Sequence, residues 1–273
     1  MLEAESAVAS KVRSIAERRA SEGFSGTDGL IAHDHTPAQR PYARAVSHHL
    51  RPSTPYATDV LLPGDPARAL AFAQQLLTEP KMSNHARGLW GYTGRTPEGR
   101  SLSIQSTGMG GPSAAIVIEE LAELGVRRAI RVGTCGALDP TLAHGDLVVA
   151  RDVLAEDGAS RALGAGEVVE PDAELTARLA DGLPSGAAPS RIVSTDLFYG
   201  GEAETWRRRG AAAVEMEAAT LFTLGGRLGV ATACALVVSD TFDDGGRRRI
   251  DDEGLAEAVE RMGEMAAAAL NPG

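Results

Sequence analysis

One arginine lies where an uncompensated charge would be costly. Arg131 occurs in the run AIRVGTCGAL, whose apolar residues indicate a buried strand that ends in a Gly-Thr-Cys-Gly turn. A buried guanidinium that has lost its partner costs roughly 3–5 kcal/mol. A bound phosphate would supply the negative charge, with Thr134 as a hydroxyl donor. A structural salt bridge is the alternative.

Two turns that follow predicted strands have the composition of ligand-binding sites. The first, LLPGDPAR, leads a predicted strand through Gly64 into a helix with Arg68 in its first turn. Backbone N–H groups at a helix start bind oxyanions, and an arginine strengthens the site. The second, STGMGGPS, has three glycines, which let a ligand approach the backbone closely. Each motif alone is also an ordinary turn or strand-to-helix connection.

Carboxylates end two further apolar runs. In AAVEMEAATLF, Glu215 and Glu217 point to the same side if the chain is still extended there. Such a pair beside Met216 suits a sugar, because carboxylates accept hydrogen bonds from vicinal hydroxyls and methionine packs on the ring. Acids at the start of a helix are the alternative. The run ALVVSDTFDD ends in Ser239 and Asp240, and this aspartate suits either acid chemistry or the N-cap of a helix.

These motifs need a scaffold of alternating strands and helices. The runs that predict strands are DVLL, SLSIQS, AIRVG, DLVVA, RIVSTD, AAVEME and ATACALVVSD. The segments with helical spacing are ARALAFAQQLL, PSAAIVIEELAELG, DAELTARLADGL and EAATLFTLGGRLG. The alternation predicts an α/β fold with a central mixed, largely parallel β-sheet flanked by helices. Ligands of such folds bind at the carboxyl ends of strands, where the motifs lie.

Length and composition are those of one globular catalytic domain. The chain has 273 residues, 43% hydrophobic and 23% charged, which suits a single α/β domain. We place it at residues 56–273, after an N-terminal tail at 1–55 that is partly disordered or packs on a partner. A net charge of −10 argues against nucleic acid as a partner, and no apolar run would span a membrane. A cytoplasmic location is expected, because no signal peptide pattern is present.

Taken in order, the five motifs resemble the nucleoside phosphorylase family, which contains hexameric bacterial purine nucleoside phosphorylase and uridine phosphorylase. The resemblance runs from about His48 to Asp240. It implies phosphorolysis of the N-glycosidic bond of a purine (deoxy)nucleoside to free base and (deoxy)ribose 1-phosphate. Inorganic phosphate would be the co-substrate, with no cofactor and no metal. Uridine phosphorylase, a nucleosidase of the same fold that uses water, and a non-enzymatic nucleoside-binding protein are alternatives.

The resemblance also implies which residues form each part of the site. Those that would bind phosphate are Gly64, Arg68, Arg87, Arg131 and Thr134. Those that would bind ribose are His48, Met109, Glu215, Met216 and Glu217. Those that would bind the base are Phe198, Val214, Ser239 and Asp240. Catalysis would fall to Arg131, Glu217 and Asp240.

Two of these residues would come from a neighbouring subunit. In the family a histidine and an arginine reach into the adjacent active site. The histidine corresponds to His48, with His49 close behind, and the arginine corresponds to Arg87. The resemblance therefore implies a homo-oligomer with shared sites, at least a dimer and, as in the hexameric members, a trimer of dimers.

The segment DLFY and the pair Ser239–Asp240 resemble the purine enzymes, in which the aspartate assists the leaving base at N7. As an acid, Asp240 would need its pKa raised from about 3.9 to about 7, and burial on loop closure would have that effect. The purine enzymes have an arginine about thirteen residues later, where this chain has Glu253. One of Arg247, Arg248 and Arg249 would substitute for it if the loop is shorter.

Overall fold

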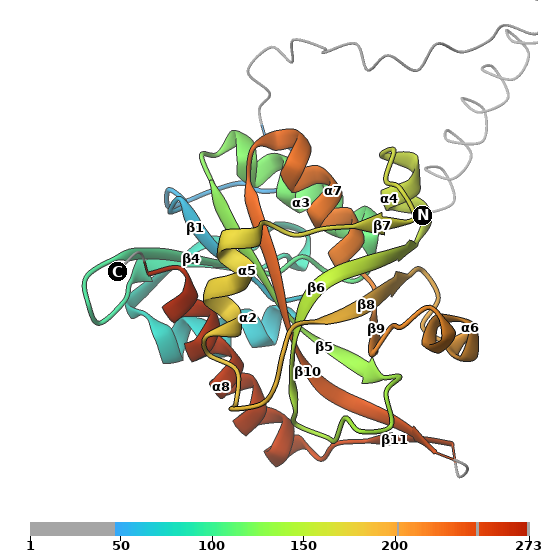
Figure 1. Cartoon of the computed structure of the whole chain (residues 1–273). Coiled ribbons are helices and arrows are strands. Elements are labelled where there is room, and N and C mark those ends of the chain that lie inside the picture. Colours follow the sequence, from blue (N-terminus) through green and yellow to red (C-terminus); the bar gives the residue numbers. More distant parts are fainter. Residues whose placement is uncertain (1–46, 201, 244–245, 272–273) are drawn as a thin grey trace, which may run out of the picture. The chain divides into compact units, whose positions relative to one another are not determined.

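A computed structural model describes residues 47–200, 202–243 and 246–271 of the chain (Figure 1). Most of the predicted N-terminal tail, residues 1–46, lies outside the described residues, so its role stays a prediction. The described strands are β1 (Asp59–Leu62), β2 (Thr78–Asn84), β3 (Gly91–Arg95), β4 (Ser101–Gln105), β5 (Arg128–Ala137), β6 (Leu147–Glu156), β7 (Val168–Val169), β8 (Ser190–Thr195), β9 (Ala213–Glu215), β10 (Ala231–Asp243) and β11 (Gly246–Arg249). The described helices are α2 (Pro66–Leu76), η1 (Ala86–Gly88), α3 (Gly111–Glu123), α4 (Gly158–Ala162), α5 (Ala173–Ala180), α6 (Ala203–Arg208), α7 (Ala218–Leu228) and α8 (Asp252–Ala269).

The strands form one mixed sheet, as predicted. Its central strands pair in the order β4–β1–β5–β10, and these pairings are parallel. Antiparallel pairs extend it through β3 and β2 on one side and through β11 on the other. Strand β6 pairs with both β10 and β8, and β9 joins β8 to β5, so these five strands close a ring. The ring was not predicted, because it depends on pairing between segments far apart in the chain.

Helices cover both faces of the sheet (Figure 1). Val60 and Leu62 of β1 belong to a core that includes side chains of α3 and α7, whereas Leu61 belongs to a core with α2, α5 and α8. The same alternation continues along β10, where Cys234 faces the first core and Val237 the second. Strands that are apolar on both faces are therefore buried between two helical layers, as expected for largely parallel sheets.

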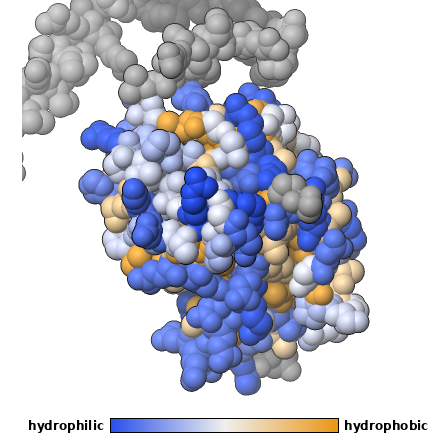
Figure 2. Space-filling model, turned by 90° about the vertical axis from the view of Figure 1, so that its left-hand side faces the viewer, coloured by the Kyte–Doolittle hydropathy of each residue, from blue (hydrophilic) through white to orange (hydrophobic). Residues whose placement is uncertain are grey.

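Most of the described helices and strands correspond to runs identified in the sequence, but eight do not: β2, β3, β7, β11, η1, α4, α6 and α8. Strand β2 is exposed along most of its length, so it lacks the apolar run on which the prediction depended. Strand β3 pairs with it as an antiparallel hairpin. Helix α8 begins at the N-cap Asp251 and buries Met262 and Ala266 against the sheet. The face shown in Figure 2 is mostly hydrophilic, with hydrophobic colour in scattered areas, because the apolar side chains lie largely inside.

Candidate active site

A cavity of about 810 Å³ opens where β1, β4, β5, β8, β9 and β10 end. Its size lies within the range of small-molecule sites, and its place at the carboxyl ends of the strands is that expected for an α/β fold. Twelve of the residues assigned from the sequence line it: Gly64, Arg68, Met109, Arg131, Thr134, Phe198, Val214, Glu215, Met216, Glu217, Ser239 and Asp240. His48 and Arg87 are not among the lining residues.

Arg131 has carboxylate partners within the chain. Its Nε donates to Oε2 of Glu215 at 2.8 Å, and its Nη2 lies 2.5 Å from Oε2 of Glu217. Burial lowers the pKa of Arg131, but the two carboxylates outweigh that effect and hold it above its ordinary value. A Cβ on Gly133 would lie 2.7 Å from Arg131 Nη2, so only glycine leaves room for the guanidinium. The salt-bridge alternative is therefore realised in the structure, at the wall of the cavity.

The two glutamates of the E-M-E segment have different surroundings. Glu215 ends β9, and its carboxylate accepts hydrogen bonds from Ser194 Oγ and from the N–H groups of Glu217 and Ala218 at the start of α7. Glu217 is the N-cap residue of α7 and has left the extended conformation. The alternative of acids at a helix start therefore holds for Glu217, and the two carboxylates converge on Arg131, whereas ribose binding stays a prediction. Glu215 is occupied by structural contacts, which leaves Glu217 as the carboxylate better placed for a ligand.

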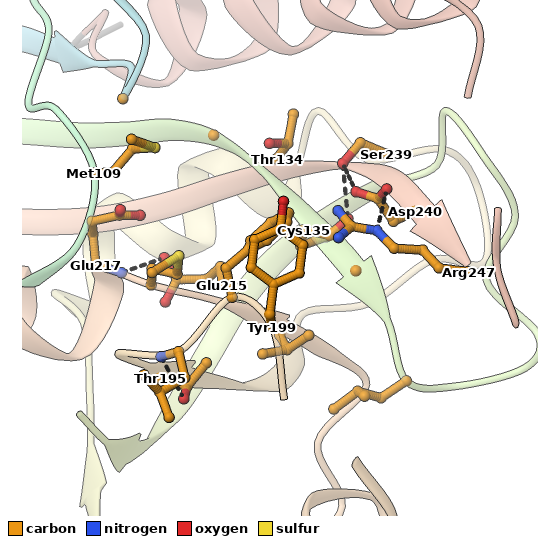
Figure 3. Close-up of a pocket in the computed structure, with 18 of the residues that line it drawn as sticks. Met109, Thr134, Cys135, Thr195, Tyr199, Glu215, Glu217, Ser239, Asp240 and Arg247 are labelled. Atoms are coloured by element: carbon orange, nitrogen blue, oxygen red, sulfur yellow. Dashed lines mark hydrogen bonds and ion pairs between the residues drawn. The ribbon is translucent and has the colours of Figure 1, made fainter. Parts of the chain in front are cut away.

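Glu217 links the arginine to the Gly-rich turn. One carboxylate oxygen accepts the N–H of Gly110, the N-cap residue of α3, while the other contacts Arg131. Burial and the neighbouring Glu215 raise the pKa of Glu217, against the lowering effect of Arg131. Met109 lies beside it and is 85% exposed, so its side chain is free to pack against a bound molecule (Figure 3).

Arg68 also lines the cavity, near enough to Arg131 for the two charges to interact. It is half-buried, and among the described residues it makes no hydrogen bond or ion pair. Burial lowers the pKa of Arg68, as do the charges of Arg131 and Arg249, against the opposing effect of Asp65. The turn beside it is tight, because a Cβ on Gly64 would lie 3.2 Å from the carbonyl oxygen of Gly108. An anion bound here would relieve repulsion among the arginines.

Asp240 occupies the other end of the cavity and is paired with Arg247 (Figure 3). Arg247 Nε donates to Asp240 Oδ1 at 2.8 Å, and Ser239 Oγ donates to Oδ2 at 2.7 Å. Burial raises the pKa of Asp240, but these hydrogen bonds and the Arg247 charge outweigh it and hold the pKa below its ordinary value. The pKa shift is thus opposite to the rise that an acid role requires. Asp240 is ionised in this state.

The short hairpin β10–β11 brings Arg247 to this position. Its register pairs Asp240 with Arg249 and Phe242 with Arg247, so the four side chains share one face of the hairpin. The guanidinium carbon of Arg247 also lies 4.2 Å from the ring centre of Phe198, the residue assigned to base stacking. Glu253 instead lies exposed in the first turn of α8 and does not line the cavity.

An apolar wall beside Asp240 was missed in the sequence. It is formed by Leu138, Leu197, Tyr199, Trp206 and Phe242. Leu138 and Trp206 are buried, whereas Tyr199 is 89% exposed at the mouth and packs edge-to-face on Phe198. Tyr199 follows Phe198 in the DLFY segment, and Phe242 follows Asp240 by two residues. These positions next to predicted site residues could have indicated the wall. An apolar wall with a few polar groups suits a planar heterocycle.

His48 and Arg87 lie outside the cavity with exposed side chains. Arg87 is in η1 and has a φ of 58°, a conformation that costs energy for a residue with a side chain. Among the described residues, no group of three or more His, Cys, Asp and Glu side chains could hold a metal ion. No helix in the part of the chain that the structure describes is both long and apolar enough to cross a membrane.

Residues 58–271 match the phosphorylase superfamily. A DeoD-type purine nucleoside phosphorylase of Caldanaerobacter subterraneus is 39% identical over 198 residues, which cover 69% of this chain and 85% of that protein. One of Geobacillus kaustophilus is 38% identical over 192 residues, covering 67% and 81%. A crystal structure of uridine phosphorylase from Vibrio fischeri superposes with a TM-score of 0.69 over 79% of this chain and 92% of that one. At 23% identity, that likeness concerns the fold alone.

Proposed function

This chain belongs to the phosphorylase superfamily, and we propose that it is a pentosyltransferase that cleaves purine (deoxy)nucleosides with inorganic phosphate. The products would be the free base and (deoxy)ribose 1-phosphate. The observation that carries the proposal is the distribution of charge in the cavity. Glu217, with its partner Arg131, lies on one side of the cavity, and Asp240 with Arg247 lies on the other (Figure 3). Arg68 lines the same cavity, near enough to Arg131 for the two charges to interact.

Phosphate would bind at the arginine end. Arg68 makes no ion pair with the residues that the structure describes, Thr134 offers a hydroxyl, and the turn around Gly64 offers backbone N–H groups. Glu217, held by Arg131 and the N–H of Gly110, would accept hydrogen bonds from the ribose hydroxyls. Phosphate would attack C1′ as the bond to the base breaks, through a transition state with oxocarbenium character. Fixed charges near that centre would stabilise it.

Asp240 would act on the purine, which would stack on Phe198. In its pairing with Arg247, the ionised carboxylate is a hydrogen-bond acceptor. To donate a proton to N7 it would first have to separate from Arg247, after which burial would be free to raise its pKa. Arg247 contacts both Asp240 and Phe198, so we propose that entry of the base displaces its guanidinium and thereby permits protonation.

Purine specificity is supported by Phe198 and Asp240 at the aromatic end and by the names of the relatives. We further propose a homo-oligomer, at least a dimer and in full a hexamer built as a trimer of dimers, that acts in the cytoplasm in purine salvage. The exposed positions of His48 and Arg87 outside this chain's own cavity support shared sites.

The test is a substrate panel of inosine, adenosine, guanosine and uridine, each with and without phosphate. We expect purine release that requires phosphate and yields ribose 1-phosphate. Equal release without phosphate would identify a nucleosidase, and a preference for uridine would assign the alternative base. If no nucleoside is cleaved under either condition and phosphate does not exchange into ribose 1-phosphate with any base, the protein binds nucleosides without turnover and the proposal is wrong.

A further inference from the structure

Glu120, on the part of α3 remote from the cavity, accepts an unusual number of hydrogen bonds. Its carboxylate receives the N–H groups of His48 at 3.1 Å, His49 at 3.0 Å and Leu50 at 2.6 Å. It also receives the hydroxyl of Ser47 at 2.6 Å and contacts Nδ1 of the His49 ring at 2.7 Å. Only 8% of Glu120 is exposed. Consecutive backbone N–H groups directed at one anion form an anion-binding concavity, and here the anion is a side chain of the same protein.

These contacts fix the charge state of Glu120. Burial raises the pKa of its carboxyl, but the hydrogen bonds from Leu50, Ser47 and His49 outweigh burial and lower it to about 2. The carboxylate is therefore ionised at every pH at which the protein would act. Hydrogen bonds to an ionised acceptor are stronger than those between neutral groups. These contacts therefore hold residues 47–50 against α3.

The same contacts distinguish two adjacent histidines. The ring of His49 is turned toward Glu120 and occupied by it. The ring of His48 is exposed and makes no hydrogen bond or ion pair with the described residues, although its backbone N–H is held. The segment thus has one histidine directed inward as an anchor and the other available to a second molecule.

We propose that Glu120 is a positioning residue that fixes the turn at residues 47–50 so that His48 reaches the ribose 5′-hydroxyl in a neighbouring subunit's cavity. This inference rests on the proposed function, in which His48 serves the adjacent site. Glu120 touches no substrate. Its effect on the reaction passes through the backbone of His48, and the benefit is confined to nucleosides that have a 5′-hydroxyl.

The variant that tests this is Glu120→Gln in the full-length chain. Glutamine keeps the volume, but its amide nitrogen cannot accept hydrogen bonds, so several donors of residues 47–50 lose their partner. The measured quantity is kcat/KM for inosine divided by that for 5′-deoxyinosine. We expect this ratio to fall about 2- to 10-fold, as for the loss of one ordinary hydrogen bond. Because phosphate is common to both reactions, any change in phosphate binding cancels in the ratio.

Three further variants complete the design. Glu119→Gln changes the adjacent, exposed glutamate of α3 and should leave the ratio unchanged. His48→Ala gives the full loss of the 5′-hydroxyl contact, and adding Glu120→Gln to it should lower the ratio no further. Ser47→Ala removes a single donor to Glu120 and should lower the ratio by a smaller factor, which keeps the test open if Glu120→Gln does not fold.

The outcomes separate this inference from the proposed function. If His48→Ala lowers the ratio but Glu120→Gln and Ser47→Ala reduce both substrates equally, Glu120 is merely structural and the inference is wrong. If His48→Ala leaves the ratio unchanged, the assignment of His48 to a shared site is wrong and the inference falls with it. If the unaltered protein cleaves neither nucleoside in the presence of phosphate, the proposed function itself is overturned.

Discussion

Arg131 has a structural role, the pairing of Glu215 and Glu217, in addition to the phosphate-binding role proposed for it. The arginine is 5% exposed and bridges two carboxylates, so two negative charges depend on it for compensation. A substitution there is expected to affect stability as well as phosphate binding, because removing one member of a buried ion pair leaves the others uncompensated.

Arg131→Met should therefore lower the free energy of unfolding by about 3–5 kcal/mol at pH 8. The loss should be smaller at pH 5. The pKa of Glu217 is already raised in the folded protein, and without the arginine it rises further. A carboxyl with a raised folded pKa binds its proton more tightly in the folded state, so stability decreases as pH rises through that pKa. Denaturant unfolding at the two pH values measures this.

Arg128→Met provides the matched control, because Arg128 pairs with Asp59 at the other end of β5 and its side chain is 28% exposed. Arg128→Met should lower the free energy of unfolding by less than Arg131→Met does, and its loss should change less between pH 5 and pH 8. Equal losses in the two variants, or a loss in Arg131→Met that grows toward pH 5, would contradict the role assigned to the two glutamates.

Asp240→Asn tests the acid at the other end of the cavity. If Asp240 protonates N7, activity on inosine should fall by on the order of 10²–10⁴-fold. It should fall far less on 7-methylguanosine, whose ring is already cationic and departs without accepting a proton. Steady-state rates at saturating phosphate give the two losses. Equal losses on both nucleosides would remove Asp240 as the acid and leave it a structural role.

Helix α7 connects the candidate site to the hydrophobic core. It begins at Glu217 in the cavity wall and ends at Gly229, which has a φ of 68°, the left-handed conformation common at helix ends. Its buried face packs in the core beside α3. Because the helix begins where the ligand would bind, its packing sets the position of Glu217.

Two adjacent glycines of α7 allow this packing to be tested. A Cβ on Gly225 would lie 2.6 Å from Thr232, whereas a Cβ on Gly226 would have nothing within 4 Å. Gly226→Ala should raise the free energy of unfolding by about 0.5–1 kcal/mol, because alanine favours helix. Gly225→Ala should lower it by about 1–3 kcal/mol through overpacking. Thermal or denaturant unfolding of both variants measures the two changes. A gain in stability for Gly225→Ala would show that the contact with β10 is not close, and a loss for Gly226→Ala would contradict the expected helix propensity.

The proposed sharing of active sites between subunits would be a property of the whole assembly. Arg87 and His48 lie outside the cavity of their own chain, so the proposed mechanism needs at least two subunits. Mixing Arg87→Ala with Glu217→Gln subunits, each inactive alone, should restore part of the activity, since some mixed sites contain both intact residues. Each variant remixed with itself is the control. A monomer by light scattering, or no recovery after verified subunit exchange, would show that each chain has a complete site.

The sequence determined those parts of the protein that depend on neighbours along the chain. The alternation of apolar runs with helical segments predicted a mixed sheet covered on both faces, and the runs around Gly64 and Asp240 predicted residues that line one cavity. Burial and the approximate ends of strands follow from local pattern, although β10 continues past Asp240 to Asp243. The exposed strand β2 has no such pattern.

The tertiary structure alone decided which charges meet. Arg131 and Glu217 are 86 residues apart in numbering, yet their side chains lie 2.5 Å apart, a distance that only the pairing of β5 with β9 and the start of α7 can set. The hairpin register placed Arg247 and Arg249 on the same face as Asp240, and the side chain of Arg247 forms the ion pair. The pKa of Asp240 is lowered, not raised, because its charged partner lies close to it in the fold. Electrostatic interactions depend on distance in space and on burial, and the order of residues alone specifies neither.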